Sequence, residues 1–419
     1  MMGVERQRLG ELLARADVAA LLAALNCDGE EARIVGGAVR NVLLGEPVAD
    51  IDVATTCLPQ ETMRRARAAG FKAVPTGVEH GTVTVVIDGA PFEVTTLRRD
   101  VETDGRHAVV AFGRDFREDA LRRDFTINAL GLDATGELHD YADGLADLAV
   151  RRVRFIGVAG ERIAEDFLRI LRFFRFHARY GVGEPDRGAL DACIAGRAGL
   201  DGLSRERVWA ELCKLLVAPR AAETLQVMAG AGLLMPVIGG VPHLSRFSAI
   251  ADGPGEGVYP AFRLAALAVA VGEDALRLRE RLRLSNAEFE RISGIAAALE
   301  ALSGRGILPE IAALRRLAHR IGNDAVAGGL VLLGTDGAST KMQALIAELV
   351  RTPPFLPTGK DVLALGVDAG PKVGQVLEAA REAWIEAGCP ADRDAQMALV
   401  AAKAVGAEVR AQTGETPRR

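Results

Sequence analysis

Two aspartates separated by a single residue, Asp50 and Asp52, are the side chains whose type and spacing most directly suggest chemistry. On a β-strand, residues i and i+2 point to the same face, so the two carboxylates project together while Ile51 and Val53 enter the core. Paired carboxylates are hard oxygen ligands of the kind that Mg²⁺ takes, with its other positions left to water and substrate phosphates. The pair therefore predicts a metal-dependent phosphate site.

A glycine turn and a short helix precede the aspartates in RIVGGAVRNVLLGEPVADID, residues 33–52. Gly36 and Gly37 let the backbone approach a ligand, and the N-terminus of the following helix offers unpaired N–H groups to an anion. Arg40, one turn into that helix, adds a bidentate phosphate donor. Alone, a glycine pair is usually a turn and a DxD pair is usually solvated surface. Their order and spacing favour a nucleoside triphosphate held between helix and metal.

A third carboxylate could join the pair. Residues 82–88 and 91–97 alternate as two strands joined by a tight turn at Asp88-Gly89. Alternation places Glu93 on the polar face of the second strand, where it could complete a carboxylate cluster with the two aspartates. The alternative is an ordinary surface glutamate on an edge strand.

Basic residues recur downstream in LRRDFTINAL, residues 121–130. Two guanidiniums and a carboxylate, among them Arg123 and Asp124, could bind a triphosphate and a ribose hydroxyl, although a structural Arg–Asp pair is the alternative. The preceding stretch, residues 98–118, is polar, contains glycine and has no clear period. It is predicted to be a mobile loop beside the site.

A second cluster occurs in EDFLRILRFFRFHARYG, residues 165–181, which predicts one largely buried helix. Asp166, Arg169, Arg172 and Arg175 recur every third residue and would form one stripe. One aspartate cannot balance three buried arginines, so an anionic, hydrogen-bonding ligand is expected to fill the gap. The alternative is an i,i+3 ion pair on a solvated face.

Together these motifs resemble the class II nucleotidyltransferases, the family of tRNA CCA-adding enzymes and bacterial poly(A) polymerases. GGAVRN…DID is similar to the family signature GGxVRD…DxD, residues 121–130 are similar to RRDxTxNA, and residues 165–176 are similar to EDxxRxLRxxRF. Residues 203–216 resemble the ER…E helix, which we interpret as structural support. The resemblance is strong over 33–216, returns over 356–384 and is weak between them.

The resemblance implies roles for individual residues. It supports Glu93 as the third catalytic carboxylate, places Arg123 on the nucleotide phosphates or ribose, and places Asp124 near the 2′-hydroxyl. Arg172 and Arg175 are assigned by it to phosphate or RNA contact.

The resemblance also makes Asp166 and Arg169 an amino-acid template for the incoming base. The chemistry of the bases agrees with this role. Cytosine and adenine each present an exocyclic amino donor beside a ring-nitrogen acceptor, which matches an aspartate acceptor beside an arginine donor. Guanine and uracil would leave both protein groups mispaired.

Length and composition predict the organisation of the chain. At 419 residues it is too long for one ordinary core. We expect an α+β fold with a polymerase-β-like head, as the resemblance implies, followed by helices only. A lead-in helix is expected over 5–25 and linkers over 238–257 and 352–359. The expected domains are a catalytic head over 1–150, a neck that recognises the base over 151–220, a body over 221–350 and a tRNA-binding tail over 351–419.

Charge and cysteine content indicate which ligands and which cellular compartment to expect. The net charge of −5 gives no global nucleic-acid signal, although residues 151–180 are locally basic. Five scattered cysteines support neither a zinc site nor a disulfide framework. There is no signal peptide or membrane span in the pattern, so a soluble, cytoplasmic protein with no evident protein partner is expected. In the tail, Lys360 and Lys372 could contact an RNA backbone, although exposed lysines usually only aid solubility.

The sequence thus predicts a Mg²⁺-dependent, template-independent enzyme that adds CCA to tRNA from CTP and ATP. Poly(A) synthesis, a specialist that adds only CC or only A, and a non-catalytic tRNA-binding protein remain alternatives. Small-molecule nucleotidyl transfer is disfavoured because it leaves the tail unexplained. Asn41 departs from the signature, which has Asp there, and this puts any carboxylate-dependent positioning of Arg40 in doubt. Phe167 stands where many members have Pro.

Overall fold

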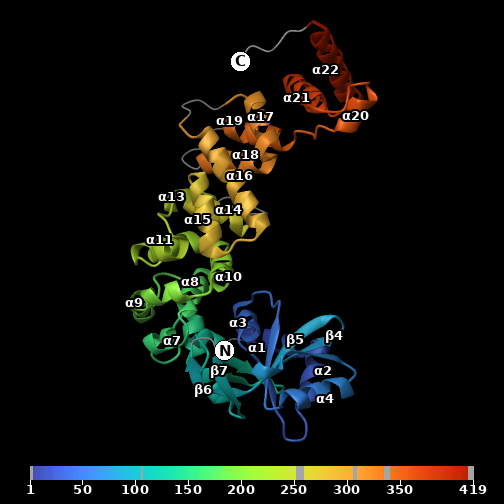
Figure 1. The fold of residues 1–419 in the computed structure, drawn as a ribbon. Helices are drawn as coiled ribbons and strands as arrows, with labels where there is room; N and C mark the ends of the chain where they lie inside the picture. Colours follow the sequence, from blue (N-terminus) through green and yellow to red (C-terminus); the bar gives the residue numbers. More distant parts are fainter. Residues whose placement is uncertain (1–2, 105–106, 252–258, 305–308, 335–339, 414–419) are drawn as a thin grey trace. The chain divides into compact units, whose positions relative to one another are not determined.

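The computed structural model describes residues 3–104, 107–251, 259–304, 309–334 and 340–413 (Figure 1). The chain forms two compact units, Met1–Val237 and Ile238–Arg419. The finer division into head, neck, body and tail stays a prediction. Across the described residues, no helix combines the length and apolar character needed to cross a bilayer.

All described strands belong to unit 1. They are β1 Ala32–Val35, β2 Ile51–Thr55, β3 Lys72–Gly77, β4 Thr82–Ile87, β5 Ala90–Thr96, β6 Arg98–Asp104, β7 His107–Phe112, β8 Leu130–Leu132 and β9 Leu138–Asp140. Seven of them form one sheet in the order β3-β4-β5-β2-β1-β8-β9, and β6 and β7 form a separate pair. β2 and β5 run parallel, and the other neighbours in the large sheet are antiparallel.

The helices of unit 1 surround this sheet and then continue the chain. They are α1 Gly3–Leu13, α2 Ala16–Leu25, α3 Gly37–Leu44, α4 Pro59–Ala68, α5 Phe116–Leu121, α6 Gly144–Ala149, α7 Ala159–Glu165, α8 Leu168–Tyr180, α9 Arg187–Ala195, α10 Arg205–Leu216 and α11 Ala221–Gly230, with α12 Leu234–Ile238 at the unit boundary. Short 3-10 turns lie at Val78–His80, Thr126–Asn128 and Arg197–Gly202. α3 packs on β1, β2 and β8, and α4 packs on β3, β4 and β5.

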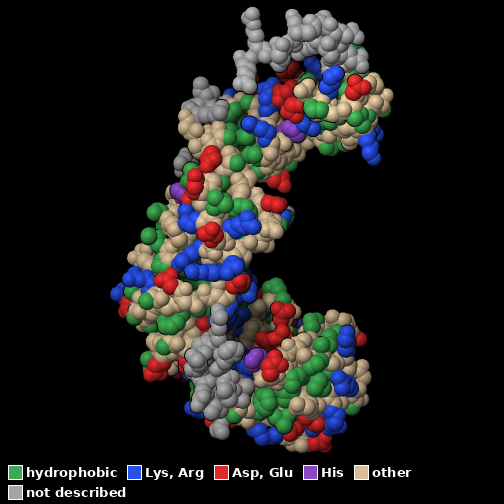
Figure 2. All heavy atoms as spheres, viewed as in Figure 1, with side chains coloured by type: hydrophobic (Ala, Val, Ile, Leu, Met, Phe, Trp, Pro, Cys, Tyr) green, Lys and Arg blue, Asp and Glu red, His purple; other side chains and the backbone are tan. Residues whose placement is uncertain are grey.

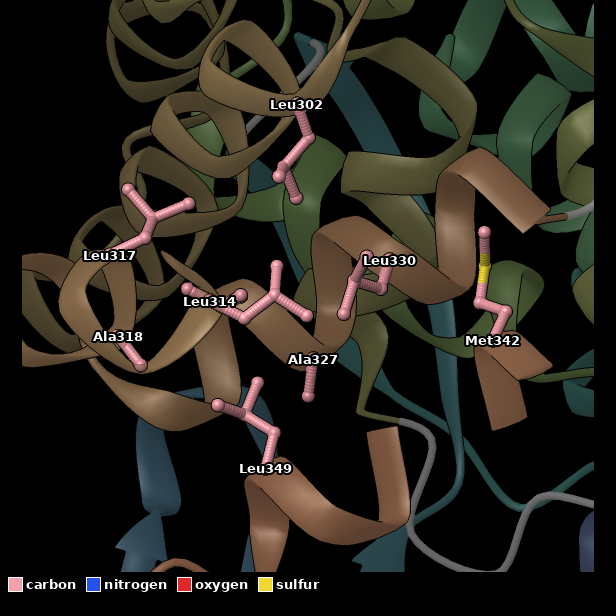
Figure 3. Close-up of a cluster of buried hydrophobic side chains, with 9 residues drawn as sticks. Leu302, Leu314, Leu317, Ala318, Ala327, Leu330, Met342 and Leu349 are labelled. Carbon is pink, nitrogen blue, oxygen red and sulfur yellow. The ribbon is translucent and has the colours of Figure 1, made fainter. Parts of the chain in front are cut away.

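Unit 2 is helical throughout its described part (Figure 1). Its helices are α13 Leu244–Ala251, α14 Pro260–Ala268, α15 Gly272–Leu282, α16 Asn286–Leu302, α17 Ile311–Ile321, α18 Asn323–Leu333, α19 Thr340–Val350, α20 Gly359–Ala364, α21 Pro371–Glu386 and α22 Arg393–Thr413. Figure 3 shows one of its cores, in which leucines from α16, α17, α18 and α19 converge with Met342. A second core joins α20, α21 and α22.

The α+β class and the helical C-terminal half are confirmed, as is the hairpin at Asp88-Gly89. That turn has φ of +49° at Asp88 and +84° at Gly89, which suits the two-residue hairpin turn that twists with its strands. β3 was not predicted, because Pro75 lies within it and the strand is at the edge of the sheet, where proline is tolerated.

Three predictions of local structure were wrong. The lead-in helix is two helices, because the backbone is extended at Arg15 and α1 and α2 then pack on different partners, α3 and α4. Residues 98–118 do not form an irregular loop: β6 and β7 pair antiparallel and α5 follows. The expected linker over 238–257 contains helix α13, which buries Phe247 and Ile250.

A cluster of aromatic rings joins the head sheet region to α8. Phe125 lies 4.9 Å from Phe155 and 5.1 Å from Phe176 between ring centroids, and Phe155 stacks on Phe173 at 5.7 Å. Backbone hydrogen bonds support the cluster, because the Thr126 N–H donates to the Arg154 carbonyl at 3.1 Å. The segment that carries RRDFTIN is thereby held against the helix that carries the arginine stripe.

Truncating this cluster is expected to destabilise unit 1. Phe173→Ala removes a fully buried ring and should lower the free energy of unfolding by about 3–5 kcal/mol. The loss is this large because the surrounding side chains can fill the void left by the ring only partly. Denaturant unfolding of the full chain, followed by circular dichroism, measures the loss. The control Val182→Ala alters a side chain that is 64% exposed and should change stability by less than ~0.5 kcal/mol. Equal effects from the two variants would contradict the role of the cluster.

Candidate active site

The turn between β1 and α3 requires glycine at its first position. Gly36 has φ of +69°, a conformation that side chains rarely adopt, and a Cβ there would lie 2.9 Å from Nη1 of Arg123. The Gly36 N–H donates to the Leu130 carbonyl at 3.0 Å, so the turn is tied to the strand after the RRDFTIN segment. The predicted turn from strand to helix is therefore present and lies against a predicted phosphate-binding arginine.

The three predicted carboxylates lie on one side of the sheet. Asp50 and Asp52 are exposed while Ile51 is buried, as the alternation predicts, although β2 itself begins only at Ile51. Glu93 is exposed on β5 and stands directly beside Asp52 in the parallel register of the two strands. The sheet therefore brings together carboxylates that are about 40 residues apart in the chain.

Negative charge accumulates at these carboxylates. Although the Asp52 side chain remains accessible to solvent, the surrounding protein atoms of the pocket remove part of its hydration and raise its pKa. The neighbouring Glu93 and Asp50 raise it further, and Arg123 opposes the shift. A divalent cation such as Mg²⁺ prefers hard oxygen ligands and would relieve the repulsion among these three carboxylates. The donor set therefore fits that ion. A different group, Asp133, Glu137 and His139 on the β8–β9 hairpin, comes closer together in the described residues, but its atoms are held by local turn contacts.

A cavity of about 570 Å³ opens beside the carboxylates, large enough for a nucleotide. Every predicted site residue except Glu93 lines it. The lining residues are Gly36, Gly37, Arg40, Asn41, Ala49, Asp50, Asp52, Arg122, Arg123, Asp124, Asn128, Asp166, Arg169, Arg172, Arg175 and Phe176. Glu93 lines a second cavity of about 320 Å³ that shares Asp52, Arg122 and Arg123 with the first. Figure 2 shows acidic and basic side chains on the walls of a hollow in unit 1.

The arginines of α8 are not left without partners, contrary to expectation. Nε of Arg172 donates to Asp124 at 2.7 Å, and Nε of Arg175 lies 2.9 Å from a carboxylate oxygen of Glu211 on α10. Arg169 pairs with Glu165 at the end of α7. The sequence argument counted only the acids on the helix itself and missed those that the fold supplies from other elements.

Asp124 is the partner that links the head to α8. It is 8% exposed. Burial works against its ionisation, but the Arg172 guanidinium, Asn128 and the Phe125 N–H hold its pKa below the usual value. Its two oxygens are thus committed to Arg172, Asn128 and the backbone. Asp124 thus forms a structural ion pair, but with Arg172 of α8 and not with the neighbouring arginines, which pair with Asp119.

Asp166 lies between helices, not within the predicted continuous helix. Its backbone is extended, with φ of −157°, because α7 ends there and α8 begins at Leu168. One side-chain oxygen accepts from the Leu168 N–H at 3.1 Å, and the other accepts from Arg207 of α10 at 2.5 Å. Asp166 and Arg169 both line the cavity, but in the described structure the contact between them is a backbone hydrogen bond, from the Arg169 N–H to the Asp166 carbonyl at 3.0 Å, and not a pairing of their side chains.

Several residues that organise the pocket were missed by sequence reasoning. Asp119 binds both Arg122 and Arg123, Tyr180 accepts a hydrogen bond from Arg40 at 2.7 Å, and Glu211 and Arg207 hold the α8 side of the pocket. The ER…E pattern of residues 203–216 was the available signal for the last two. Its residues were interpreted as support, and in the structure they do contact the site residues directly.

Comparison with known proteins places this architecture in a family. The family model described as the poly A polymerase head domain matches residues 32–154, and one described as the probable RNA and SrmB-binding site of polymerase A matches residues 190–247. The mouse protein named CCA tRNA nucleotidyltransferase 1, mitochondrial, is 34% identical over 385 residues, covering 89% of this chain and 87% of the mouse protein.

The chain belongs to the CCA tRNA nucleotidyltransferase family.

Other members agree with this assignment. A CCA-adding enzyme of Streptococcus pyogenes is 43% identical over 202 residues, covering 48% of this chain and 49% of that protein. The crystal structure of the Bacillus stearothermophilus CCA-adding enzyme in complex with CTP matches with a TM-score of 0.71 and 26% identity, covering 98% of this chain and all of the other. A Thermotoga maritima CCA-adding enzyme complexed with tRNA shares the fold at a TM-score of 0.70 and 20% identity, covering 94% of this chain and 97% of the other.

The raised pKa of Asp52 has a consequence for stability. A carboxyl whose pKa is higher in the folded than in the unfolded state lowers stability when ionised, and this penalty disappears as pH falls through the folded value. Asp52→Asn is therefore expected to raise the melting temperature at pH 7 by a small amount, because the residue is exposed and solvent screens its charge. The advantage should decline as pH falls through the folded value and vanish below pH ~3, where the carboxyl is protonated in both states.

Thermal unfolding in buffer with EDTA measures this effect without a neutralising metal. The control Glu184→Gln removes an exposed carboxylate elsewhere in unit 1 and should leave the melting temperature unchanged. A lower melting temperature for Asp52→Asn at pH 7 would mean that the charge cluster does not destabilise the folded state.

Proposed function

We propose that this protein adds CCA to the 3′ end of tRNA, without a nucleic-acid template, using CTP and ATP and releasing pyrophosphate. The observation that carries the proposal is a single cavity that joins Asp50 and Asp52 to Asp166 and Arg169 beside α8. Family membership supports it, because the relatives that match over most of the chain are named for CCA addition.

The reaction requires groups that line different parts of the cavity. The 3′-hydroxyl oxygen of the RNA forms a bond to the α-phosphorus of the nucleotide and loses its proton. The bond between the α-phosphorus and the oxygen that bridges to the β-phosphate breaks, and pyrophosphate leaves. Asp50 and Asp52, with Glu93 beside them, would hold Mg²⁺. When bound, this ion stabilises the charge that develops on the phosphate oxygens.

The chain's own donors position the phosphates. The first turn of α3 offers backbone N–H groups, and the Arg40 and Arg123 side chains line the same cavity. Arg123 is paired with Asp119 at 3.2 Å, which orients its guanidinium, and the residue still lines the cavity. Four of the five N–H groups of Arg40 already have partners in the described structure, so its contribution is mainly its charge.

Asp166 and Arg169 are proposed to select the base. Each Asp166 oxygen has one protein partner, which leaves acceptor capacity, and Arg169 uses only Nη1 in the contacts among described residues. The amino group and ring nitrogen of cytosine or adenine would bind this acceptor and donor. The contacts of Arg172 and Arg175 with Asp124 and Glu211 make these two arginines supports of the wall, with phosphate or RNA contact as a further proposed role.

Other parts of the proposal concern RNA and location. The tail helices α20 and α21 expose Lys360 and Lys372, which are proposed to contact the tRNA backbone. A cytoplasmic location stays a prediction, because the mouse relative is named a mitochondrial enzyme. Poly(A) synthesis is the alternative favoured by the description of the head-domain model.

The decisive experiment supplies tRNA that ends at the discriminator base with CTP, ATP or both, and sequences the products. Addition that stops after CCA is expected, and Asp52→Asn should reduce incorporation by at least about a thousandfold while tRNA binding persists, as for loss of a group that stabilises the transition state. Long A tracts on any RNA would establish poly(A) synthesis. Products ending in CC alone or a single A would indicate a specialist, and no incorporation would favour a non-catalytic tRNA-binding protein.

The proposed template makes a separate prediction about nucleotide choice. Asp166→Ala should reduce discrimination against UTP and GTP by about tenfold or more, because the acceptor that distinguishes an amino group from a carbonyl is lost. Incorporation of each nucleotide alone measures this ratio. The matched control Asp191→Ala removes an aspartate from an exposed ion pair on α9 and should leave the ratio unchanged. An unaltered preference in Asp166→Ala would place the template elsewhere.

A further inference from the structure

Arg40 differs from the other arginines that line the cavity. Each of the others has a carboxylate partner: Asp119 for Arg122 and Arg123, Glu165 for Arg169, Asp124 for Arg172, and Glu211 for Arg175. Arg40 is only 6% exposed and forms no ion pair within the part of the chain that the structure describes. Among the described residues it is the one arginine on this wall with no carboxylate at ion-pair distance, and Glu46 acts on it only from farther away.

Neutral groups hold Arg40 instead. The Asn41 side-chain oxygen accepts from Nε at 3.1 Å and from Nη2 at 2.9 Å, Tyr180 accepts from Nη2 at 2.7 Å, and Asn128 accepts from Nη1. The Tyr180 ring lies under the guanidinium at 4.0 Å, and Phe176 lies at 5.3 Å. These contacts fix the orientation of the guanidinium but add no negative charge.

Both the oxygen and the nitrogen of the Asn41 side-chain amide form hydrogen bonds. While its oxygen accepts from Arg40, its nitrogen donates to the Pro47 carbonyl at 3.0 Å. Pro47 lies in the short connection between α3 and β2, which leads directly to Asp50. A carboxylate at position 41 could accept from Arg40 but could not donate to Pro47. The structure therefore uses properties of asparagine that the aspartate of the family signature does not have.

A buried cation with only neutral partners is expensive unless an anion completes its environment. Burial and the charge of Arg175 lower the pKa of Arg40, while contact with Tyr180 and the more distant carboxylate of Glu46 oppose this shift. Arg40, Gly36 and Gly37 line the same cavity. On the proposed function, the anion that arrives in this cavity is the triphosphate of CTP or ATP.

We propose that Asn41 and Tyr180 are positioning residues that orient Arg40 while preserving its full positive charge for the phosphates of the incoming nucleotide. The proposal rests on the proposed function and deepens it. In this chain the triphosphate, not a neighbouring carboxylate, is the counter-ion of Arg40. A carboxylate introduced at position 41 would compete with the nucleotide for that charge.

Equilibrium binding to the full chain without RNA tests this inference. CTP, CMP and inorganic tripolyphosphate are titrated with Mg²⁺ into the wild type and Asn41→Asp. The variant should bind CTP and tripolyphosphate about tenfold more weakly, the range expected for loss of one charge-assisted contact, and CMP should be affected less. Tyr180→Phe keeps the ring but removes an acceptor, so a loss of about threefold for the same two ligands is expected.

Two further variants separate charge from folding. Asn286→Asp makes the same substitution beside another arginine, since Arg279 donates to Asn286 at 3.3 Å on an exposed part of unit 2, and should leave all affinities unchanged. Asn41→Ala removes the orienting amide but adds no charge. It should therefore bind tripolyphosphate more tightly than Asn41→Asp, even if both variants lose the contact with Pro47.

The outcomes are distinct. Wild-type affinity for tripolyphosphate in Asn41→Asp, or weaker binding by Asn41→Ala than by Asn41→Asp, would overturn the inference. Loss of CTP binding with unchanged tripolyphosphate binding would also overturn it, because Arg40 would then act on base or ribose. Since no RNA is present, these results report on Arg40 alone, whereas the tRNA product assay reports on the proposed function.

Discussion

Partly buried arginines on one helix are the constraint on which the rest of unit 1 depends. Arg172 and Arg175 lie among buried aromatic side chains, where removing a charge from water is costly unless acids from elsewhere reach it. The head supplies Asp124 and α10 supplies Glu211. Satisfying these charges therefore also fixes where the head segment, α8 and α10 lie within the unit. The same ion pairs that neutralise the helix shape one wall of the cavity.

Other charges that line the cavity are not neutralised in this way. Asp50, Asp52 and Glu93 gather negative charge that the described part of the protein compensates only in part, mainly through Arg123. Arg40 carries positive charge without a carboxylate partner. A cavity with excess negative charge at one place and excess positive charge at another is suited to a ligand that arrives as a cation and a polyanion together. Electrostatics thus support the pairing of metal and nucleotide more strongly than either charge cluster does alone.

The sequence predicted well those features that depend on neighbours in the chain. The glycine turn, the facing of Asp50 and Asp52, the Asp88-Gly89 hairpin and the buried face of α8 follow from local periodicity, and the structure has all of them. The prediction failed where local structure depends on a residue that is distant in the sequence. Asp166, where the predicted helix is interrupted, contacts Arg207, 41 residues away, and the partners of the α8 arginines come from other elements. The β6–β7 pair was missed because residues 98–118 were judged by polarity, although residues 107–112 (HAVVAF) have a strand-like composition.

The parallel pairing of β2 and β5 has a consequence for how the chain can change in length. Glu93 stands beside Asp52 only while the count of residues along β5 is preserved, because one inserted residue would turn Glu93 from the pocket to the core. The tip of the hairpin at Asp88-Gly89 is under no such restriction, since residues added there leave the pairing of the flanking strands intact. Insertions and deletions should therefore accumulate at this tip during evolution. The same tip is a natural position for attaching a tag or probe near the carboxylates without altering their geometry.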